Sequence, residues 1–326
     1  MNNFRTIINE NPSVDKLDLH HRVLTMGSCF AEIIGTKLRM QKIDTLINPF
    51  GTAYNPYSIH KIFQFAIDNK VELDSGLIKQ QDIYFNYDFH SEFSSLTKSD
   101  LENKIISTVA STHSFLKSTD WVILTYGTAW VYKRKDTEDV VSNCHKVPVH
   151  HFTKSLLTEG EITTSFEGVY KALKKIHPKI KFLLTVSPVR HIKDTIELNS
   201  VSKAVLRLAC HRITSSCQDV HYFPAYEIMI DDLRDYRFYK SDMIHPSDVA
   251  ENYIWEKFVD RYANAELKKF LKEWQEILAA LAHRPFHPNS MSHQNFLKEL
   301  IARLDDLKEV VNIDLEKKTV IDQLMQ

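Results

Sequence analysis

Ser28, Asp242 and His245 are residues whose types could together make an activated nucleophile. A serine hydroxyl is a weak nucleophile and needs a base that works near neutral pH, most often a histidine. The histidine needs a third group that fixes its tautomer. Asp242 precedes His245 by three residues, so its carboxylate can bend back to the imidazole within one turn. The spacing favours such a pair over an Asp and a His that share a surface by chance.

Ser28 follows a short apolar run, His21 to Gly27, that predicts a buried strand. Apolar residues then recur at helical spacing, at Phe30, Ile33, Ile34 and Leu38. A serine at such a turn lies at the positive end of a helix dipole, which suits a nucleophile whose attack creates an oxyanion. The alternative is a serine that only caps the helix.

An oxyanion hole requires two or three donors, and three positions are candidates. The backbone N–H of Ser28 is the first. Gly51 is the second, because a glycine lets the backbone approach a ligand closely. The third is Thr128, in the Gly127-Thr128 turn after the third predicted strand. Each glycine could equally form a plain turn.

Arg190 and His191 follow another predicted strand, and we expect both to face the same edge of the sheet as Ser28. An arginine there could clamp a carboxylate or a sugar hydroxyl, or form a structural ion pair. Asn48, in the loop after the second strand, and Asn143, in a later loop, are predicted to contact substrate as well.

Cys29 and a histidine cluster are the competing candidates. The side chain after Ser28 points elsewhere at a helix start, so we expect Cys29 to be buried rather than nucleophilic. His145, His150 and His151 match no ordinary zinc spacing, so no metal is predicted. His145 either contacts substrate or is an ordinary loop histidine.

Strands alternate with helices along most of the chain, which predicts an α/β fold with a mostly parallel sheet and helices on both faces. In such sheets ligands bind beyond the carboxyl ends of the strands. The candidate residues should therefore converge there. The predicted strands are residues 21–27, 43–47, 120–125, 180–186 and 220–224.

Three further segments complete the organisation. Residues 71–100 are polar and aromatic and are interpreted as an excursion, such as a hairpin. In the helix near residues 201–209, the predicted common face is Val201, Val205, Leu208 and Ala209. Two amphipathic helices end the chain, so we predict an α/β domain over residues 1–262 and a helical extension over 263–326, packed on that domain.

Composition excludes several classes of protein. The 326 residues carry a net charge of -1 and are 43% hydrophobic, which argues against disorder and gives no reason to expect nucleic acid or membrane as partner. The polar start and the absence of an 18-residue apolar run predict a cytoplasmic protein. The four cysteines show no CxxC spacing and are expected to be reduced. Nothing indicates the oligomeric state.

The string Gly27-Ser28-Cys29-Phe30-Ala31 resembles the signature of the GSCFA family, which is grouped with the SGNH, or GDSL-like, hydrolases. The resemblance spans about residues 20 to 300. The other segments that resemble the family are 48–52, 127–130, 143–148, 187–191, 236–239, 242–247 and 283–286.

The resemblance implies a three-layer α/β/α fold of flavodoxin-like type and ester hydrolysis or acyl transfer. Ser28 matches the SGNH serine, Asp242 and His245 match the Asp-x-x-His pair, and Gly51 matches the second-block glycine. One departure stands out, because the pattern places Gly-x-Asn after the third strand and this chain has Gly127-Thr128-Ala129. Thr128 substitutes, or Asn143 or His145 arrives from a later loop, or the oxyanion hole is weaker.

We therefore expect a serine esterase without cofactor, acting on a small-molecule or carbohydrate ester, with an acetyl group on a sugar as one example. The first alternative is an O-acyltransferase that passes the acyl group to a sugar hydroxyl. The second is a degenerate fold that binds a glycan or acyl ligand without turnover.

Overall fold

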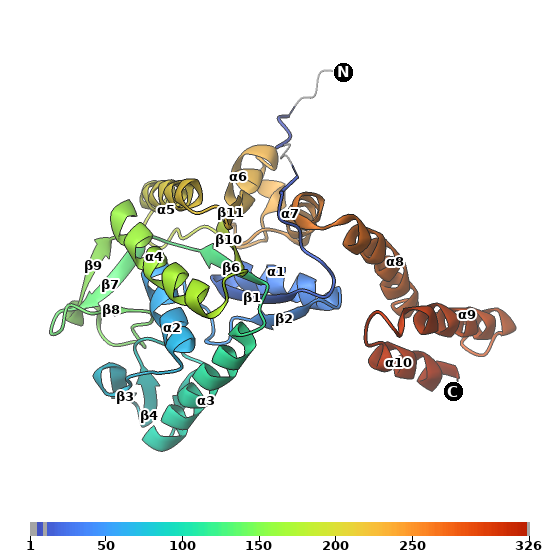
Figure 1. Cartoon of the computed structure of the whole chain (residues 1–326), viewed down its shortest axis with the longest axis horizontal. Coiled ribbons are helices and arrows are strands. Elements are labelled where there is room, and N and C mark those ends of the chain that lie inside the picture. Colours follow the sequence, from blue (N-terminus) through green and yellow to red (C-terminus); the bar gives the residue numbers. More distant parts are fainter. Residues whose placement is uncertain (1–4, 9–11, 325–326) are drawn as a thin grey trace.

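Five parallel strands form the central sheet of the computed structural model, which describes residues 5–8 and 12–324. Their spatial order is β2-β1-β6-β10-β11 (Figure 1). Counted among the central strands alone this is the order 2-1-3-4-5 of flavodoxin-like folds. The predicted α/β class is confirmed. The strands are β1 (Arg22–Gly27), β2 (Asp44–Ile47), β6 (Trp121–Tyr126), β10 (Lys181–Val186) and β11 (Val220–Phe223).

The strands form where the sequence has nearly continuous apolar runs. All six residues of β6 are buried, as are the last five of β10. Parallel strands are covered on both faces, so they lack the alternation of polar and apolar residues seen in half-exposed strands. This places the carboxyl ends of β1, β6 and β10 side by side, because the three strands pair in order.

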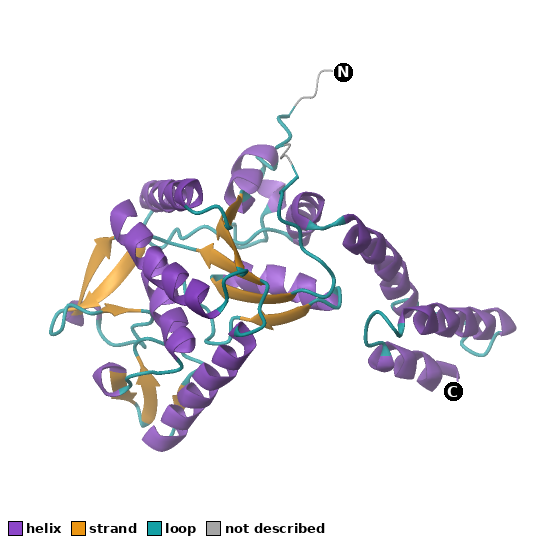
Figure 2. Ribbon diagram, in the orientation of Figure 1, coloured by secondary structure: helices purple, strands orange, loops and turns teal. Residues whose placement is uncertain are grey.

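Helices cover both faces of the sheet, giving three layers (Figure 2). Leu24 and Met26 of β1 join one apolar cluster and Val23 joins the other, as the alternation of a strand requires. The first cluster includes residues of α2 (Pro56–Asp68), α3 (Lys98–Leu116), α4 (Glu159–Ile176) and α5 (Ile196–Ser216). The second includes residues of α1 (Cys29–Met40) and α7 (Asp248–Tyr262).

Two small antiparallel sheets are added to this core. The aromatic segment 71–100 forms the hairpin that the sequence predicted, with one more short strand. Residues 130–156 form the other sheet. The strands are β3 (Leu77–Gln80), β4 (Ile83–Asn86), β5 (Ser94–Ser95), β7 (Trp130–Arg134), β8 (Val140–Val141) and β9 (Phe152–Leu156), with the short helices η1 (Asp74–Gly76) and η2 (Val149–His151).

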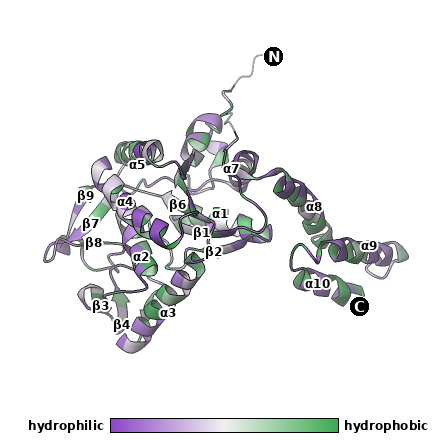
Figure 3. Cartoon of the chain, in the orientation of Figure 1, coloured by the Kyte–Doolittle hydropathy of each residue, from purple (hydrophilic) through white to green (hydrophobic). Residues whose placement is uncertain are grey.

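The C-terminal helices α8 (Ala265–Leu281), α9 (Met291–Leu307) and α10 (Asp314–Leu324) extend away from the sheet (Figure 1). The Trp274 indole N–H donates to the Met40 carbonyl at 2.9 Å, and Lys42 pairs with Glu316 at 2.7 Å. Hydrophobic and hydrophilic residues alternate along α8 and α9 (Figure 3), as in helices that bury one face. Within residues 5–8 and 12–324, no helix is long and apolar enough to cross a membrane.

Helix α5 differs from the prediction. Val201 and Leu208 are 46% and 47% exposed, so the predicted common face is wrong. The inward positions of its first half are polar instead, at Asn199, Ser202 and Lys203. These positions are polar because this half of the helix lies against loops at the strand ends, whose backbone groups need hydrogen-bond partners. For example, Ser202 Oγ accepts the N–H of Ala129 at 2.7 Å.

Candidate active site

The turn from β1 to α1 fixes Ser28. Gly27 has φ +138°, and a Cβ at that position would lie 2.1 Å from the Thr125 carbonyl oxygen, so only glycine fits. Ser28 follows as the N-cap residue, but its side chain makes no capping hydrogen bond. Its Oγ is buried and has no hydrogen-bond partner in the described part of the chain. An unpaired buried hydroxyl costs free energy, so Ser28 does not stabilise the helix as a side-chain cap in this conformation.

Asp242 and His245 are brought into contact, as the spacing predicted. The His245 Nδ1 and Asp242 Oδ2 lie 2.7 Å apart. Asp242 Oδ1 accepts the N–H groups of Ile244 and His245 at 2.8 and 3.0 Å. These bonds stabilise the ionised carboxylate and lower the pKa of Asp242 to about 2. Near neutral pH the imidazole therefore faces a full negative charge.

The loop that carries this pair is attached to the segment after β10. Arg190 donates its backbone N–H to the Ile244 carbonyl at 3.2 Å. Its guanidinium carbon lies 3.8 Å from the centre of the Tyr239 ring. Tyr239 in turn forms a bridge with Pro246. These contacts hold His245 at the carboxyl edge of the sheet, where Ser28 also lies.

Gly127 and His191 are neighbours of Ser28 at this edge of the sheet. A Cβ built on Gly127 would lie 3.3 Å from Ser28 Cβ and 3.0 Å from His191 Nε2. Burial, together with the charges of Lys203 and His245, lowers the pKa of His191 to about 4. His191 Nε2 is buried and, like Ser28 Oγ, lacks a partner among the described residues. Ser28 and His191 thus both lie against Gly127, and His245 lies close enough to His191 to affect its pKa. Among the described residues no hydrogen bond joins the Ser28 hydroxyl to either imidazole.

The predicted oxyanion donors make other hydrogen bonds in this conformation. The N–H of Ser28 donates to the Thr125 carbonyl at 3.1 Å and that of Gly51 to the Asn48 carbonyl at 2.8 Å. Thr128 donates its N–H to the Tyr54 carbonyl at 3.0 Å, and its hydroxyl contacts Ser202 Oγ at 3.1 Å.

Asn48 has a free donor beside Ser28. Its Oδ1 accepts the Gly27 N–H at 2.9 Å. Its Nδ2 is buried without a partner in the described part of the chain. The left-handed backbone at Asn48, with φ +38°, turns the chain so that the side chain reaches the end of β1.

Asn143 and His145 lie against the aromatic hairpin. Asn143 Nδ2 donates to Ser91 Oγ at 3.1 Å. His145 is 4% exposed, its ring stacks on Phe85 with 4.8 Å between centroids, and its Nε2 lies 2.9 Å from the Asn86 carbonyl oxygen. None of the hydrogen bonds of the described residues joins either side chain to Ser28 or His245.

Lys203 is a residue of the site that the sequence interpretation missed. It is 1% exposed, and its Nζ donates to the carbonyls of Gly127 and Ser187 at 2.8 and 2.7 Å. Burial lowers its pKa to about 7. The only signal was its place on α5, three and seven residues before the buried Leu206 and Cys210.

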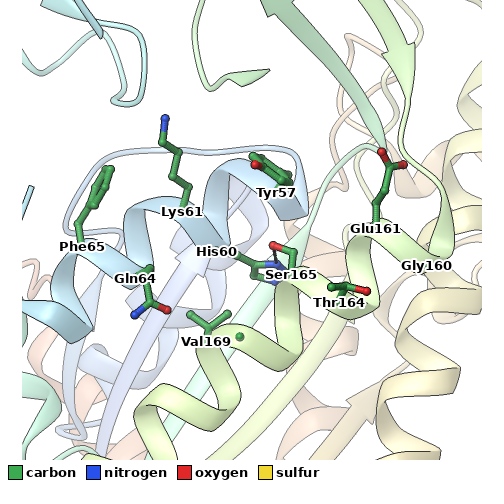
Figure 4. A pocket seen from close by; sticks show the side chains of 11 residues that line it. Tyr57, His60, Lys61, Gln64, Phe65, Gly160, Glu161, Thr164, Ser165 and Val169 are labelled. Atoms are coloured by element: carbon green, nitrogen blue, oxygen red, sulfur yellow. Dashed lines mark hydrogen bonds between the residues drawn. The ribbon is translucent and has the colours of Figure 1, made fainter. Parts of the chain in front are cut away.

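A cavity with mostly apolar walls lies elsewhere, between α2 and α4, with a volume of about 610 Å³. There Ser165 and His60 point toward each other (Figure 4), with Oγ and Nδ1 3.0 Å apart. His60 Nε2 lies 2.7 Å from the Tyr126 hydroxyl. Burial lowers the pKa of His60 to about 3, so this imidazole is a poor base.

Two further candidates can be placed. Burial raises the pKa of the Cys29 thiol, which disfavours the thiolate. In the described ranges no three His, Cys, Asp or Glu side chains gather as metal ligands.

Two family models match most of the chain. The model of the GSCFA family matches residues 22–258, and that of the GSCFA domain protein, C-terminal domain, matches residues 274–326. The chain belongs to the GSCFA family. Among curated protein sequences none matches it.

Several solved structures are similar at low identity. One, from Streptococcus pneumonia, is provisionally named a platelet activating factor. It has 11% identity and a TM-score of 0.37, and the match covers 74% of this chain and 84% of that chain. A carbohydrate esterase family 3 structure from Talaromyces cellulolyticus has 11% identity and TM-score 0.34, covering 78% and 99%. An acetyl xylan esterase from Butyrivibrio proteoclasticus has 10% identity and TM-score 0.34, covering 83% and 66%.

Proposed function

We propose that the protein is a serine-dependent esterase in which Ser28 is the nucleophile, His245 the general base and Asp242 the group that orients His245. The observation that supports this most is the Asp242–His245 hydrogen bond of 2.7 Å at the sheet edge where Ser28 Oγ lies unpaired. A charged carboxylate on Nδ1 leaves Nε2 free to take a proton.

In the proposed reaction Ser28 Oγ attacks the ester carbonyl carbon while His245 Nε2 takes the hydroxyl proton. The tetrahedral intermediate collapses, and His245 gives this proton to the leaving alcohol. Water, deprotonated by the same imidazole, then attacks the acyl-enzyme, and His245 returns that proton to Ser28 Oγ as the acid leaves. Catalytic hydrogen bonds in ligand-free enzymes are often absent until substrate binds, so the unpaired Ser28 hydroxyl fits this scheme.

The proposed oxyanion donor is Asn48 Nδ2, together with the N–H groups of Ser28, Gly51 and Thr128 once substrate competes for them. Asn48 comes first because its Nδ2 has no other partner in the described part of the chain. This donor would replace the asparagine missing after Gly127-Thr128. Preorganised donors of this kind contribute a large part of catalysis in acyl transfer.

The proposed substrate is an acyl ester of a small molecule or carbohydrate, contacted by Arg190 and His191, and the proposed compartment is the cytoplasm. The four cysteines, all free thiols, agree with a reducing compartment. An acyltransferase would use the same acyl-enzyme. A ligand-binding protein without turnover is the second candidate, favoured by the one observation that Ser28 makes no hydrogen bond to His245.

A fluorophosphonate probe followed by peptide mass spectrometry tests the proposal. We expect a covalent adduct on Ser28 in the native protein, and none at that position in Ser28→Ala. His245→Ala should slow the labelling by about 10³-fold or more, because the hydroxyl loses its base. Ser165→Ala is the matched control and should label normally. A folded native protein that leaves Ser28 unlabelled would favour the ligand-binding candidate.

A further inference from the structure

We propose that a carboxylate on a short aliphatic chain binds in a cavity beside Ser28, held by Arg190, Lys203 and Asn199, and that the substrate carries this group. The assignment of the carboxylate to the substrate rests on the proposed function, whereas its binding does not.

The cavity has a volume of about 180 Å³ and lies between α5, the segment after β10 and the turns that follow β11. This is smaller than pockets that take drug-sized ligands. It suits a short chain rather than a whole sugar. Arg190, Asn199 and Lys203 all line it, and its lining holds no aspartate or glutamate.

Lys203 supplies a buried positive charge without a counter-ion. Two of its three N–H groups reach the carbonyls of Gly127 and Ser187, and the third has no acceptor among the described residues. An ammonium held out of water without a negative partner is costly, so an anion that enters the cavity is attracted to it. The low pKa of Lys203, about 7, reflects the same cost.

Arg190 and Asn199 add donors on the same cavity. Arg190 forms no ion pair in the described part of the chain. Its guanidinium lies over the rings of Tyr236 and Tyr239 and donates to the Met243 carbonyl at 3.4 Å. Asn199 Oδ1 accepts the N–H of His191 at 2.9 Å, which leaves its Nδ2 as a donor. A guanidinium, an ammonium and an amide on one small cavity are the partners that a carboxylate requires.

Apart from Ser200, the remaining walls are aliphatic or aromatic, and this selects the rest of the ligand. Val189 is buried, while the side chains at the mouth stay exposed. These exposed side chains are Ile192, Ile196, Ile230 and Tyr236, which are 41%, 63%, 42% and 64% accessible. Apolar residues gathered in the open around a cavity mark a place where an apolar ligand surface is covered.

The cavity is joined to the nucleophile by short links. Lys203 holds the carbonyl of Gly127, and Gly127 lies against Ser28 Cβ and His191 Nε2. On the other side, Arg190 holds the loop that carries His245. A carboxylate bound here therefore lies within one short chain of the reacting serine.

Calorimetric titration with butyrate tests the binding, with butyramide as the neutral probe of equal shape. We expect butyrate to bind the native protein and butyramide to bind at least about tenfold more weakly, because the charge-assisted hydrogen bonds are lost. Arg190→Gln should weaken butyrate by about tenfold as well. Arg237→Gln, an exposed arginine on the neighbouring turn η4 (Tyr236–Phe238), should leave the affinity unchanged.

The pH dependence gives a second readout that does not depend on a folded Lys203 variant. Butyrate stays ionised from pH 6 to 8.5, while Lys203 loses its proton as the pH passes about 7. Affinity should therefore fall as the pH rises. The other titratable or charged groups facing Lys203 are Cys29 on α1, Arg190 and His191 after β10, and Tyr226 on α6 (Ala225–Glu227).

Protection of Ser28 separates this inference from the proposed function. Butyrate should slow fluorophosphonate labelling of Ser28 in the native protein and much less in Arg190→Gln. Equal binding of butyrate and butyramide, or no effect of Arg190→Gln, would overturn the carboxylate site even if Ser28 is labelled normally. Butyrate that binds through Arg190 to a protein whose Ser28 never labels would retain the site and reject the esterase. Binding without protection would reject the assignment to substrate.

Discussion

Two regions of the molecule each hold a serine and a histidine that could act together, and they differ in the third group. At the sheet edge, His245 bonds to the carboxylate of Asp242 and is 39% exposed. Between α2 and α4, His60 bonds to the hydroxyl of Tyr126 and is 2% exposed. Only the second pair has a serine–histidine hydrogen bond in this structure, Ser165 to His60 at 3.0 Å.

A short serine–histidine distance is therefore a poor guide to nucleophilic chemistry. A base must accept a proton, which requires solvation or a negative partner for the imidazolium. Asp242 supplies that partner at the sheet edge. The buried His60 has neither solvation nor a negative partner, so Ser165, His60 and Tyr126 form a hydrogen-bonded structural element.

Asp242→Asn gives the largest effect expected from the comparison. Asparagine keeps an oxygen for the two backbone N–H groups but removes the charge that fixes the His245 tautomer. We expect the rate of Ser28 labelling to fall by about 10³ to 10⁴-fold. Asp248→Asn, an exposed position in the first turn of α7, is the control. Equal rates in the two variants would contradict the role of Asp242.

Asn48→Asp tests the free amide and should have an intermediate effect. Aspartate keeps the acceptor for the Gly27 N–H and replaces only the Nδ2 donor. Loss of one oxyanion donor costs about 10²-fold or more in kcat. KM should change little, because the donor acts on the transition state.

Asn143→Asp adds the same charge at a side chain bonded to Ser91 and should leave kcat unchanged. Both variants are first compared by urea unfolding, so that a loss of folded protein is not mistaken for a loss of catalysis. A normal kcat in folded Asn48→Asp would remove Asn48 from the oxyanion hole.

Tyr126→Phe tests the other region and should affect stability alone. The change leaves the buried His60 Nε2 without its partner, which costs about 1 to 3 kcal/mol in the free energy of unfolding. Tyr57→Phe is the control, because Tyr57 lines the same cavity and is 40% exposed. Ser28 labelling should be normal in both. A selective loss of labelling in folded Tyr126→Phe would mean that the two regions are coupled.

Much of the fold could be predicted because apolar runs and helical spacing report burial directly. The strands, the turn at Gly27-Ser28 and the aromatic hairpin are examples. Helix α5 was misread because the pattern weighs apolar residues only, whereas Lys203 and Ser202 turn inward to satisfy backbone groups at the strand ends. Such partners lie far apart in sequence, so no local pattern reveals them.

The site could be predicted in part for the same reason. Asp242 and His245 are three residues apart, and their hydrogen bond is a local one. The state of the donors depends on tertiary hydrogen bonds, such as Ser28 to Thr125 and Asn48 to Gly27, which spacing does not report. The role of Lys203 depends on how α5 packs against the strand ends, which the sequence pattern does not report.

Gly27 has a consequence for anyone who diversifies this protein. Gly27 has φ +138°, and a neighbouring carbonyl oxygen lies 2.1 Å from where a Cβ would be, so glycine is the one residue that position 27 tolerates. Its N–H is bonded to Asn48 and its carbonyl to Ala53. A library built around Ser28 should therefore hold Gly27 constant, and a replacement for Asn48 should keep a side-chain acceptor for the Gly27 N–H.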